Sequence, residues 1–191
     1  MIKRVCGSFF FMAALLLAAA PFTGCAGKDF NSLRAGIERR GHYIEGVPFY
    51  RQRESSCGPA ALATVLAFWG RPSDLERITD KVYLPELRGT LPMDMETFLR
   101  EAGFETSSSA GTLGQLKAWV RSNVPVICLL DLGFGPYRQP HYVTVIGFDD
   151  VNAVIIAHDG LKANRVIGYD AFGKQWDRAG DWMLAARPKS P

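Results

Sequence analysis

The chain of 191 residues is 48% hydrophobic and 21% charged, with a formal net charge of +3. That length suits one domain with a full hydrophobic core. Lys3 and Arg4 belong to an N-terminal segment of export type, and without them 20 basic residues face 19 acidic ones. The basic balance is therefore no sign of a nucleic-acid partner, and we expect none.

Residues 1–24 have the layout of an export signal. Lys3 and Arg4 precede an apolar stretch from Phe9 to Ala20, and small residues follow. The apolar stretch is short for a bilayer span, and its flanks are those of a cleaved signal rather than a stop-transfer helix. We therefore expect residues 1–24 to be removed.

The end of the signal, Phe22-Thr23-Gly24-Cys25, resembles the lipobox of bacterial lipoproteins. The resemblance implies that Cys25 is lipidated and becomes the new N-terminus, so the protein would be anchored to a membrane of the cell envelope by its lipid. The non-acidic Ala26 favours the outer membrane, facing the periplasm, if the organism is Gram-negative. An ordinary signal peptide with a chance cysteine is the alternative.

The next segment, residues 25–46, is predicted to be a lipidated N-terminus and tether. It is polar, carries Arg39-Arg40-Gly41 and has no clear apolar period, as is typical of a linker. We therefore expect one folded domain over residues 47–191.

The first half of this domain has helical patterns. Residues 59–69 are apolar almost throughout and are followed by a glycine, which predicts a helix buried on all sides at the domain centre. Ser73, with Glu76 three residues later, is expected to cap a second helix. Residues 92–103 and 112–123 predict two further amphipathic helices.

The pattern then changes to short runs rich in β-branched residues, at 124–130, 141–148 and 153–158, and the tail holds YDAFGKQW and DWMLAA. Helices followed by strands indicate an α+β domain. The sequence predicts a helical first half with a buried central helix and an antiparallel sheet in the second half.

Cys57 lies where the central helix is expected to begin. Pro59 suits an opening helical position, where a missing N–H costs nothing. Free N–H groups at a helix start favour a thiolate, and Gly58 leaves the sulfur open to a substrate. We predict that Cys57 is a nucleophile; a thiol packed under the first helical turn is the structural alternative.

Cys57 and Cys128 are the two cysteines expected in the folded part. They could form one disulfide in an oxidising compartment. Cys128, however, lies in a continuous apolar run of buried-strand type, where cysteine usually behaves as a small hydrophobic residue.

A nucleophilic thiol needs a base that a third group orients. His141 opens the second predicted strand, and the turn after Phe148 leads into the third. If Phe148 pairs with Ala153, the antiparallel register places His141 opposite Gly160 and beside Asp159. This arrangement predicts His141 as the base and Asp159 as the group that orients it.

Other assignments are open at this point. His158 is the rival base, but neighbours in a strand point to opposite faces, so His158 and Asp159 cannot both face one site. His42 lies in the predicted tether. Asp159 with Gly160 is also a common turn pair, which would give the aspartate a purely structural role.

Gln52 completes the candidate set. Its side-chain NH2 could donate a hydrogen bond to the oxyanion that forms when sulfur attacks a carbonyl group, next to the backbone N–H of Cys57. The chain order Gln52, Cys57, His141, Asp159 is a stronger signal than any member alone.

These segments together resemble the bacteriocin-processing cysteine peptidases, which cut after double-glycine leaders and belong to the papain-like clan. The resemblance spans residues 47–186 and is carried by Gln52, CGPAAL at 57–62, Gly89-Thr90, PHYVTVIGFDD at 140–150 and IAHDG at 156–160. It implies a papain-like fold in which Cys57 is the nucleophile, His141 the base, Asp159 the orienting acid and Gln52 the oxyanion donor. Two departures are Gly160, where the family often has proline, and the lack of an exporter's transmembrane bundle.

The expected function is hydrolysis of a peptide bond through a thioester acyl-enzyme, with a peptide or protein as substrate. We expect no cofactor and no nucleotide, because GYDAFGKQ at 168–175 has phosphate-loop spacing but lacks the Ser or Thr that holds magnesium. The alternatives are an acyltransferase or amidase that uses the same thioester, a non-catalytic lipoprotein that binds or assembles, and a zinc site of Cys57, His141 and His158. Residues 133–138, just before His141, could act as a lid.

Overall fold

The computed structural model describes residues 29–53, 55–72 and 74–189. Its helices are α1 (Phe30–Arg34), α2 (Ile37–Arg40), α3 (Cys57–Phe68), α4 (Leu75–Val82), the 3-10 helix η1 (Pro85–Leu87), α5 (Pro92–Glu101), α6 (Leu113–Arg121) and α7 (Tyr169–Asp177). Its strands are β1 (Gly41–Tyr43), β2 (Phe104–Ala110), β3 (Val126–Asp131), β4 (Pro140–Asp149), β5 (Val154–His158), β6 (Arg165–Gly168) and β7 (Trp182–Pro188). None of the helices within these ranges is long and apolar enough to cross a membrane.

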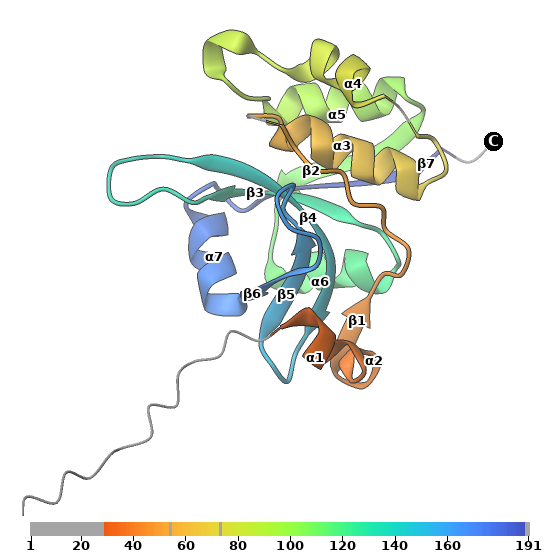
Figure 1. Ribbon diagram of the computed structural model, residues 1–191, viewed down its shortest axis with the longest axis vertical. Coiled ribbons are helices and arrows are strands. Elements are labelled where there is room, and N and C mark those ends of the chain that lie inside the picture. The colour runs from red at the N-terminus through yellow and green to blue at the C-terminus, as the bar shows by residue number, and fades with distance from the viewer. Residues whose placement is uncertain (1–28, 54, 73, 190–191) are drawn as a thin grey trace, which may run out of the picture.

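All strands join one antiparallel sheet with the order β2-β7-β3-β4-β5-β6, and β1 pairs with β4 beside this path. Figure 1 shows α3, α4 and α5 gathered on one side of the sheet and α7 on the other side. The predicted α+β architecture is therefore confirmed, with helices leading and most of the sheet following.

The two largest hydrophobic cores lie on opposite faces of the sheet, because strand residues alternate between its faces. On one face, Ile127 packs with residues of α3, α4 and α5. On the other face, Cys128 packs with residues of α6 and α7. Neighbouring residues of β3 thus pack into opposite cores. Because both faces of the central strands are buried, their sequences are continuous apolar runs.

The central helix α3 forms as its sequence predicts. Every residue from 58 to 66 is buried, so the helix has no solvent face. Pro59 lies in its first turn, where the backbone N–H has no intrahelical partner. The helix ends before Gly70, whose φ of +69° lies in the left-handed region. As a result, Cys57 is held at the start of a rigid element.

Two of the described helices begin with a side-chain cap, and the one cap that the sequence predicted differs in the structure. At α6, Thr112 accepts from the backbone N–H of Gln115, whose side chain accepts in return from the backbone N–H of Thr112. At α4 the cap is Asp74, whose carboxylate accepts from the backbone N–H of Glu76 at 3.1 Å. Ser73, the predicted cap, lies outside the described residues.

The predicted tether is wrong for its described part, because residues 30–44 pack on the sheet. Leu33, Ile37 and Ile44 are buried, and β1 pairs with β4. Arg40 forms an ion pair of 2.9 Å with the fully buried carboxylate of Asp149. The folded part therefore begins before residue 47; sparse apolar residues in a polar segment gave too weak a period to reveal this. Cys25 and residues 1–28 lie outside the described part of the chain.

The β4–β5 hairpin forms, but in a different register from the predicted one. Phe148 pairs with Ile155 instead of Ala153, and the turn occupies residues 150–153. A bulge between Val145 and Gly147 then shifts the pairing again by one residue. The hairpin still returns the chain to the beginning of β4, which is what the candidate site requires.

Candidate active site

An open groove with a volume of about 800 Å³ is lined by residues of the segment from η1 to α5 and of the start of β4. Gln52, Cys57 and His141 all line this groove. Asp159 does not line the groove, but its backbone carbonyl oxygen contacts the ring of His141. Gln52, Cys57 and His141 thus share one groove although they are up to 89 positions apart in the sequence, and Asp159 contacts His141.

Cys57 is the first residue of α3, partly exposed and not in a disulfide. Burial raises the pKa of its thiol, and the backbone N–H groups of Tyr142, Gly58 and Cys57 only oppose this shift. The helix start does favour the thiolate as expected, but burial outweighs it and the pKa of Cys57 is raised overall. Cys57 rests as a neutral thiol and needs a base to become a nucleophile.

His141 is buried, and its Nε2 lies 2.9 Å from the backbone carbonyl oxygen of Asp159. A carbonyl oxygen can only accept, so Nε2 carries the proton and Nδ1 of the neutral ring keeps a free lone pair. Burial lowers the pKa of His141, and the nearby Arg165 charge lowers it further, while Asp159 acts in the opposite direction. The ring is thus a neutral base with its tautomer fixed.

The carboxylate of Asp159 has a different role from the predicted one in this geometry. Its Oδ1 accepts from the backbone N–H groups of Leu161 and Lys162 at 2.9 and 2.5 Å, and its Oδ2 pairs with Arg165 at 2.7 Å. These contacts lower the pKa of Asp159 although burial opposes them. The carboxylate shapes the turn, and the backbone carbonyl of the same residue holds His141.

Gln52 is anchored by its backbone, whose N–H donates to the carbonyl of Gly160 at 2.8 Å. Its side-chain Oε1 is buried without a hydrogen-bond partner. A Cβ atom added at Gly160 would meet that oxygen at 2.4 Å, and Gly160 has a φ of +77°. The glycine that departs from the family pattern is therefore required both by its backbone conformation and by Gln52.

The structure excludes the rival base by its hydrogen bonds and the rival disulfide by the face of the sheet on which Cys128 lies. His158 lies near Cys57 in a small cavity, but its Nδ1 accepts from the N–H of Asn164 and its Nε2 faces the carbonyl of Val47 at 3.1 Å. Both ring nitrogens are occupied, so His158 is a structural residue. Cys128 is fully buried in the opposite core and is free.

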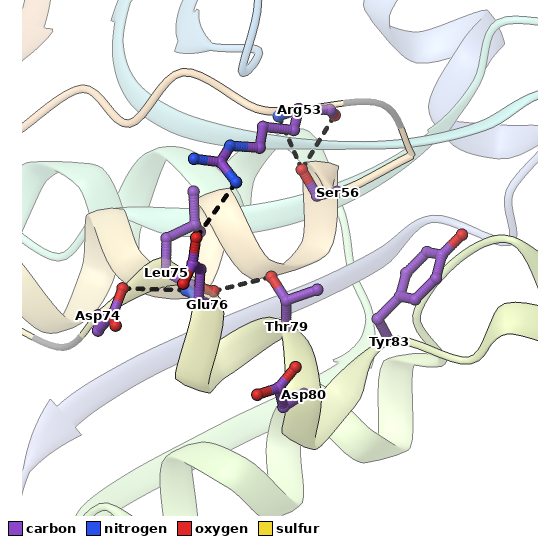
Figure 2. Close-up of a pocket in the computed structure, with 8 residues that line it drawn as sticks. All are labelled: Arg53, Ser56, Asp74, Leu75, Glu76, Thr79, Asp80 and Tyr83. Atoms are coloured by element: carbon purple, nitrogen blue, oxygen red, sulfur yellow. Dashed lines mark hydrogen bonds and ion pairs between the residues drawn. The ribbon is translucent and has the colours of Figure 1, made fainter.

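A second pocket, called here the acidic pocket, has a volume of about 400 Å³ and lies along α4 (Figure 2). Asp74, Glu76 and Asp80 line it, and Arg53 reaches across to Glu76 at 3.3 Å. Neither Cys57 nor any other member of the candidate set lines it. Within the described residues, no group of three or more His, Cys, Asp or Glu side chains is arranged to hold a metal ion.

Thr90 is a groove residue for which the sequence alone gave no role. Its Oγ1 is buried without a partner, while its carbonyl accepts from the hydroxyl of Tyr142 at 2.9 Å. A Cβ atom at Gly58 would meet Thr90 at 2.8 Å, so the glycine after Cys57 makes room for this residue. The Gly89-Thr90 pair in the sequence was the available signal.

The architecture, with a cysteine at the start of the central helix and a histidine on the adjoining strand, is that of C39 peptidase domains. The chain belongs to the Peptidase C39-like family, whose model matches residues 44–183. No curated protein matches the chain.

Solved structures share the fold at low sequence identity. The peptidase domain of Streptococcus ComA, a bi-functional ABC transporter involved in quorum sensing, has 22% identity and a TM-score of 0.61 over 75% of this chain and 99% of its own. A double glycine motif protease from an AMS/PCAT transporter, in complex with the leader peptide, has 21% identity and a TM-score of 0.63 over 78% and 95%. A C39-like peptidase candidate of Bacillus anthracis has 16% identity and a TM-score of 0.63 over 80% and 100%.

Proposed function

We propose that this protein is a cysteine peptidase that hydrolyses peptide bonds through a thioester on Cys57. The observation that carries the proposal is the shared groove, which Cys57 lines from the start of α3 and His141 from the start of β4. In the described part of the chain, two buried side-chain oxygens lack a partner, those of Gln52 and Thr90, and both residues line the groove beside Cys57. A buried polar group without a partner is costly, and a bound ligand or water can satisfy it. Membership of the Peptidase C39-like family supports the same chemistry.

In the first step, the sulfur of Cys57 bonds to the carbonyl carbon of the substrate while Nδ1 of His141 takes the thiol proton. The carbonyl oxygen becomes an oxyanion. The side-chain NH2 of Gln52 and the backbone N–H of Cys57 are the proposed donors to it. The C–N bond then breaks, and His141 delivers its proton to the leaving amine.

In the second step, a water molecule loses a proton to His141 and attacks the thioester. The C–S bond breaks, the acid product leaves, and the proton returns from His141 to the sulfur. Because the pKa of Cys57 is raised and that of His141 is lowered, the neutral pair is the resting state. His141 must therefore remove the thiol proton for Cys57 to react as a thiolate.

A peptide is the proposed substrate class. The AMS/PCAT protease of the same fold is seen with a leader peptide, and the groove of this chain is open, with a volume of about 800 Å³. Double-glycine leaders are the substrates that the family resemblance implies, and we propose them as the first peptides to try.

We also propose that Cys25 carries a lipid that anchors the domain in the cell envelope, facing the periplasm in a Gram-negative organism. The sequence of residues 1–25 is the support. Mass spectrometry of the mature N-terminus tests whether Cys25 carries a lipid. A diacylglyceryl adduct on Cys25 is expected, and an unmodified N-terminus after another residue would contradict it.

The experiment that tests the peptidase is capture of the acyl-enzyme. The full chain is mixed with a library of double-glycine leaders and cell-envelope peptides, quenched in acid and examined by mass spectrometry. An acyl adduct on Cys57 and cleaved peptides are expected. Cys57→Ala should give neither, and Cys128→Ala should give both, because Cys128 lies in the opposite core.

Other outcomes distinguish the alternatives. Cleavage that survives Cys57→Ala would contradict the thioester mechanism. A thioester that passes to a labelled amine in preference to water would indicate an acyltransferase. Peptides that bind but never acylate Cys57 would indicate a binding module on the same fold.

A further inference from the structure

The charged side chains that line the groove beside Cys57 are of one sign. They belong to Arg88 and Arg138, and no acidic residue lines the groove among those described. The guanidinium of Arg138 already has partners within the chain, since it pairs with Asp131 at 2.8 Å and donates to the carbonyl of Arg178. Arg88 is exposed and has neither an ion pair nor a side-chain hydrogen bond within the described ranges. Its charge is available to a ligand.

The backbone of Arg88 is held in an unfavourable conformation. With φ of 48° and ψ of 42° it is left-handed, a region that costs free energy for residues with a Cβ atom. The N–H of Arg88 donates to the carbonyl of Pro85 at 3.1 Å, and Leu84 bridges to Gly89. A glycine would adopt this conformation freely, so the arginine at the groove wall costs stability without an intramolecular contact in return.

The neighbours of Arg88 are apolar and exposed. Leu87 is 59% exposed and Leu91 is 37% exposed, and both line the groove. Thr90, with its unpaired hydroxyl, lies between them and Cys57. This wall therefore offers one free positive charge between apolar surfaces, which complements a carboxylate side chain flanked by apolar ones.

We propose that Arg88 is a specificity-determining residue, and that the groove selects peptides with an Asp or Glu side chain, next to an apolar one, within a few residues of the scissile bond. This inference rests on the proposed peptidase function and names its substrate class. Arg88 acts on substrate choice and takes no part in the chemistry at Cys57.

The test is peptide selection by the Cys57→Ala protein, which cannot turn substrate over. A random synthetic decapeptide library is equilibrated with the full chain, and the bound peptides are sequenced by mass spectrometry. We expect enrichment of Asp and Glu over Lys and Arg by about fivefold, the upper end of what an exposed ion pair contributes. The enrichment should disappear in 1 M salt, which screens such pairs.

Two variants at the same position sharpen the test. In Arg88→Glu the preference should reverse toward Lys and Arg. In Arg88→Gly it should vanish while the fold is kept, because glycine suits the left-handed backbone. Arg77→Glu, at an exposed position of α4 outside the groove, makes the same change of net charge and should keep the acidic preference.

The inference and the proposed function fail differently. An unchanged peptide set in Arg88→Glu, or no charge preference at all, would overturn the inference. Acidic peptides that are bound by the Cys57→Ala protein but never cut when Cys57 is present would keep the inference and overturn the peptidase. A library from which no peptide binds would overturn both.

Discussion

The groove beside Cys57 and the acidic pocket along α4 differ in how their polar groups are satisfied. In the acidic pocket, Glu76 pairs with Arg53, and Ser56 both accepts from and donates to the backbone of Arg53. In the groove, Gln52 and Thr90 each keep a buried oxygen without a partner. These polar groups of the acidic pocket are satisfied within the chain, whereas those two groove oxygens are not. The groove is thus both the larger of the two pockets and the one with unsatisfied polar atoms.

The largest expected effect concerns Gln52, as the proposed oxyanion donor. Gln52→Ala should lower turnover by roughly 10²- to 10³-fold, because one preorganised donor to the oxyanion is lost. Stability should hardly change, since the side-chain oxygen of Gln52 has no partner to lose. Steady-state kinetics and thermal unfolding measure the two effects.

The matched control is Gln175→Ala on α7, outside the groove. It should leave turnover unchanged. Full activity in Gln52→Ala, together with loss of activity in Cys57→Ala, would show that the oxyanion assignment is wrong.

The next effect separates the two ways in which Asp159 can support His141. Asp159→Asn keeps an oxygen that can accept from the N–H groups of Leu161 and Lys162, so the turn and the carbonyl that holds His141 should persist. We expect a loss of activity within about tenfold for Asn, and a larger loss, about 10²-fold, for Asp159→Ala. The ratio of kcat/KM values of the two variants is the measurement.

The opposite pattern has a clear meaning. A fall of about 10⁴-fold in Asp159→Asn would match a carboxylate that bonds directly to the histidine ring. The carboxylate would then have to leave Arg165 and turn to His141 during the reaction, in conflict with the paired arrangement.

A smaller effect is expected in the pH dependence of stability. Burial lowers the pKa of both His141 and His158 from 6.5, so both are neutral in the fold. Below pH 6.5 the unfolded chain binds protons that the folded chain does not, so the free energy of unfolding should fall as pH decreases from 6.5. Hydrogen bonds from Gln139, Arg138 and Gly133 lower the pKa of Asp131 from 3.8. Protonation of this carboxylate should therefore reduce the free energy of unfolding only below pH 3.8.

Urea unfolding at pH 7.5, 6.5 and 5.0 measures this decline. Stability that stays constant or rises between pH 6.5 and 5.0 would mean that the two histidines are not buried as neutral rings.

The smallest effect is expected in the acidic pocket. The ion pair of Glu76 with Arg53 is highly exposed, with side chains 71% and 79% accessible. Glu76→Gln should change stability by less than about 0.5 kcal/mol and leave kcat/KM unchanged. A clear loss of activity would instead make the acidic pocket part of the substrate site and remove the contrast with the groove.

The sequence predicted the elements whose signals are local. The central helix follows from an apolar run that ends at a glycine, and α6 follows from an amphipathic pattern. The hairpin was predicted correctly as an element, but its predicted register was wrong. Neither the bulge after Val145 nor the length of the turn leaves a clear mark in the alternation of apolar residues. Residues 30–44 were assigned to a tether because Leu33 and Ile37 are too sparse to show a period.

By itself the sequence determined the fold class, the family and the four candidate residues, because apolar period, turn chemistry and motif spacing are properties of neighbouring residues. Only the tertiary structure decided which atoms of those residues meet. The carbonyl of Asp159 rather than its carboxylate holds His141, and burial keeps Cys57 a neutral thiol. Solvation and hydrogen-bond partners depend on segments distant in the chain, so no local pattern encodes them.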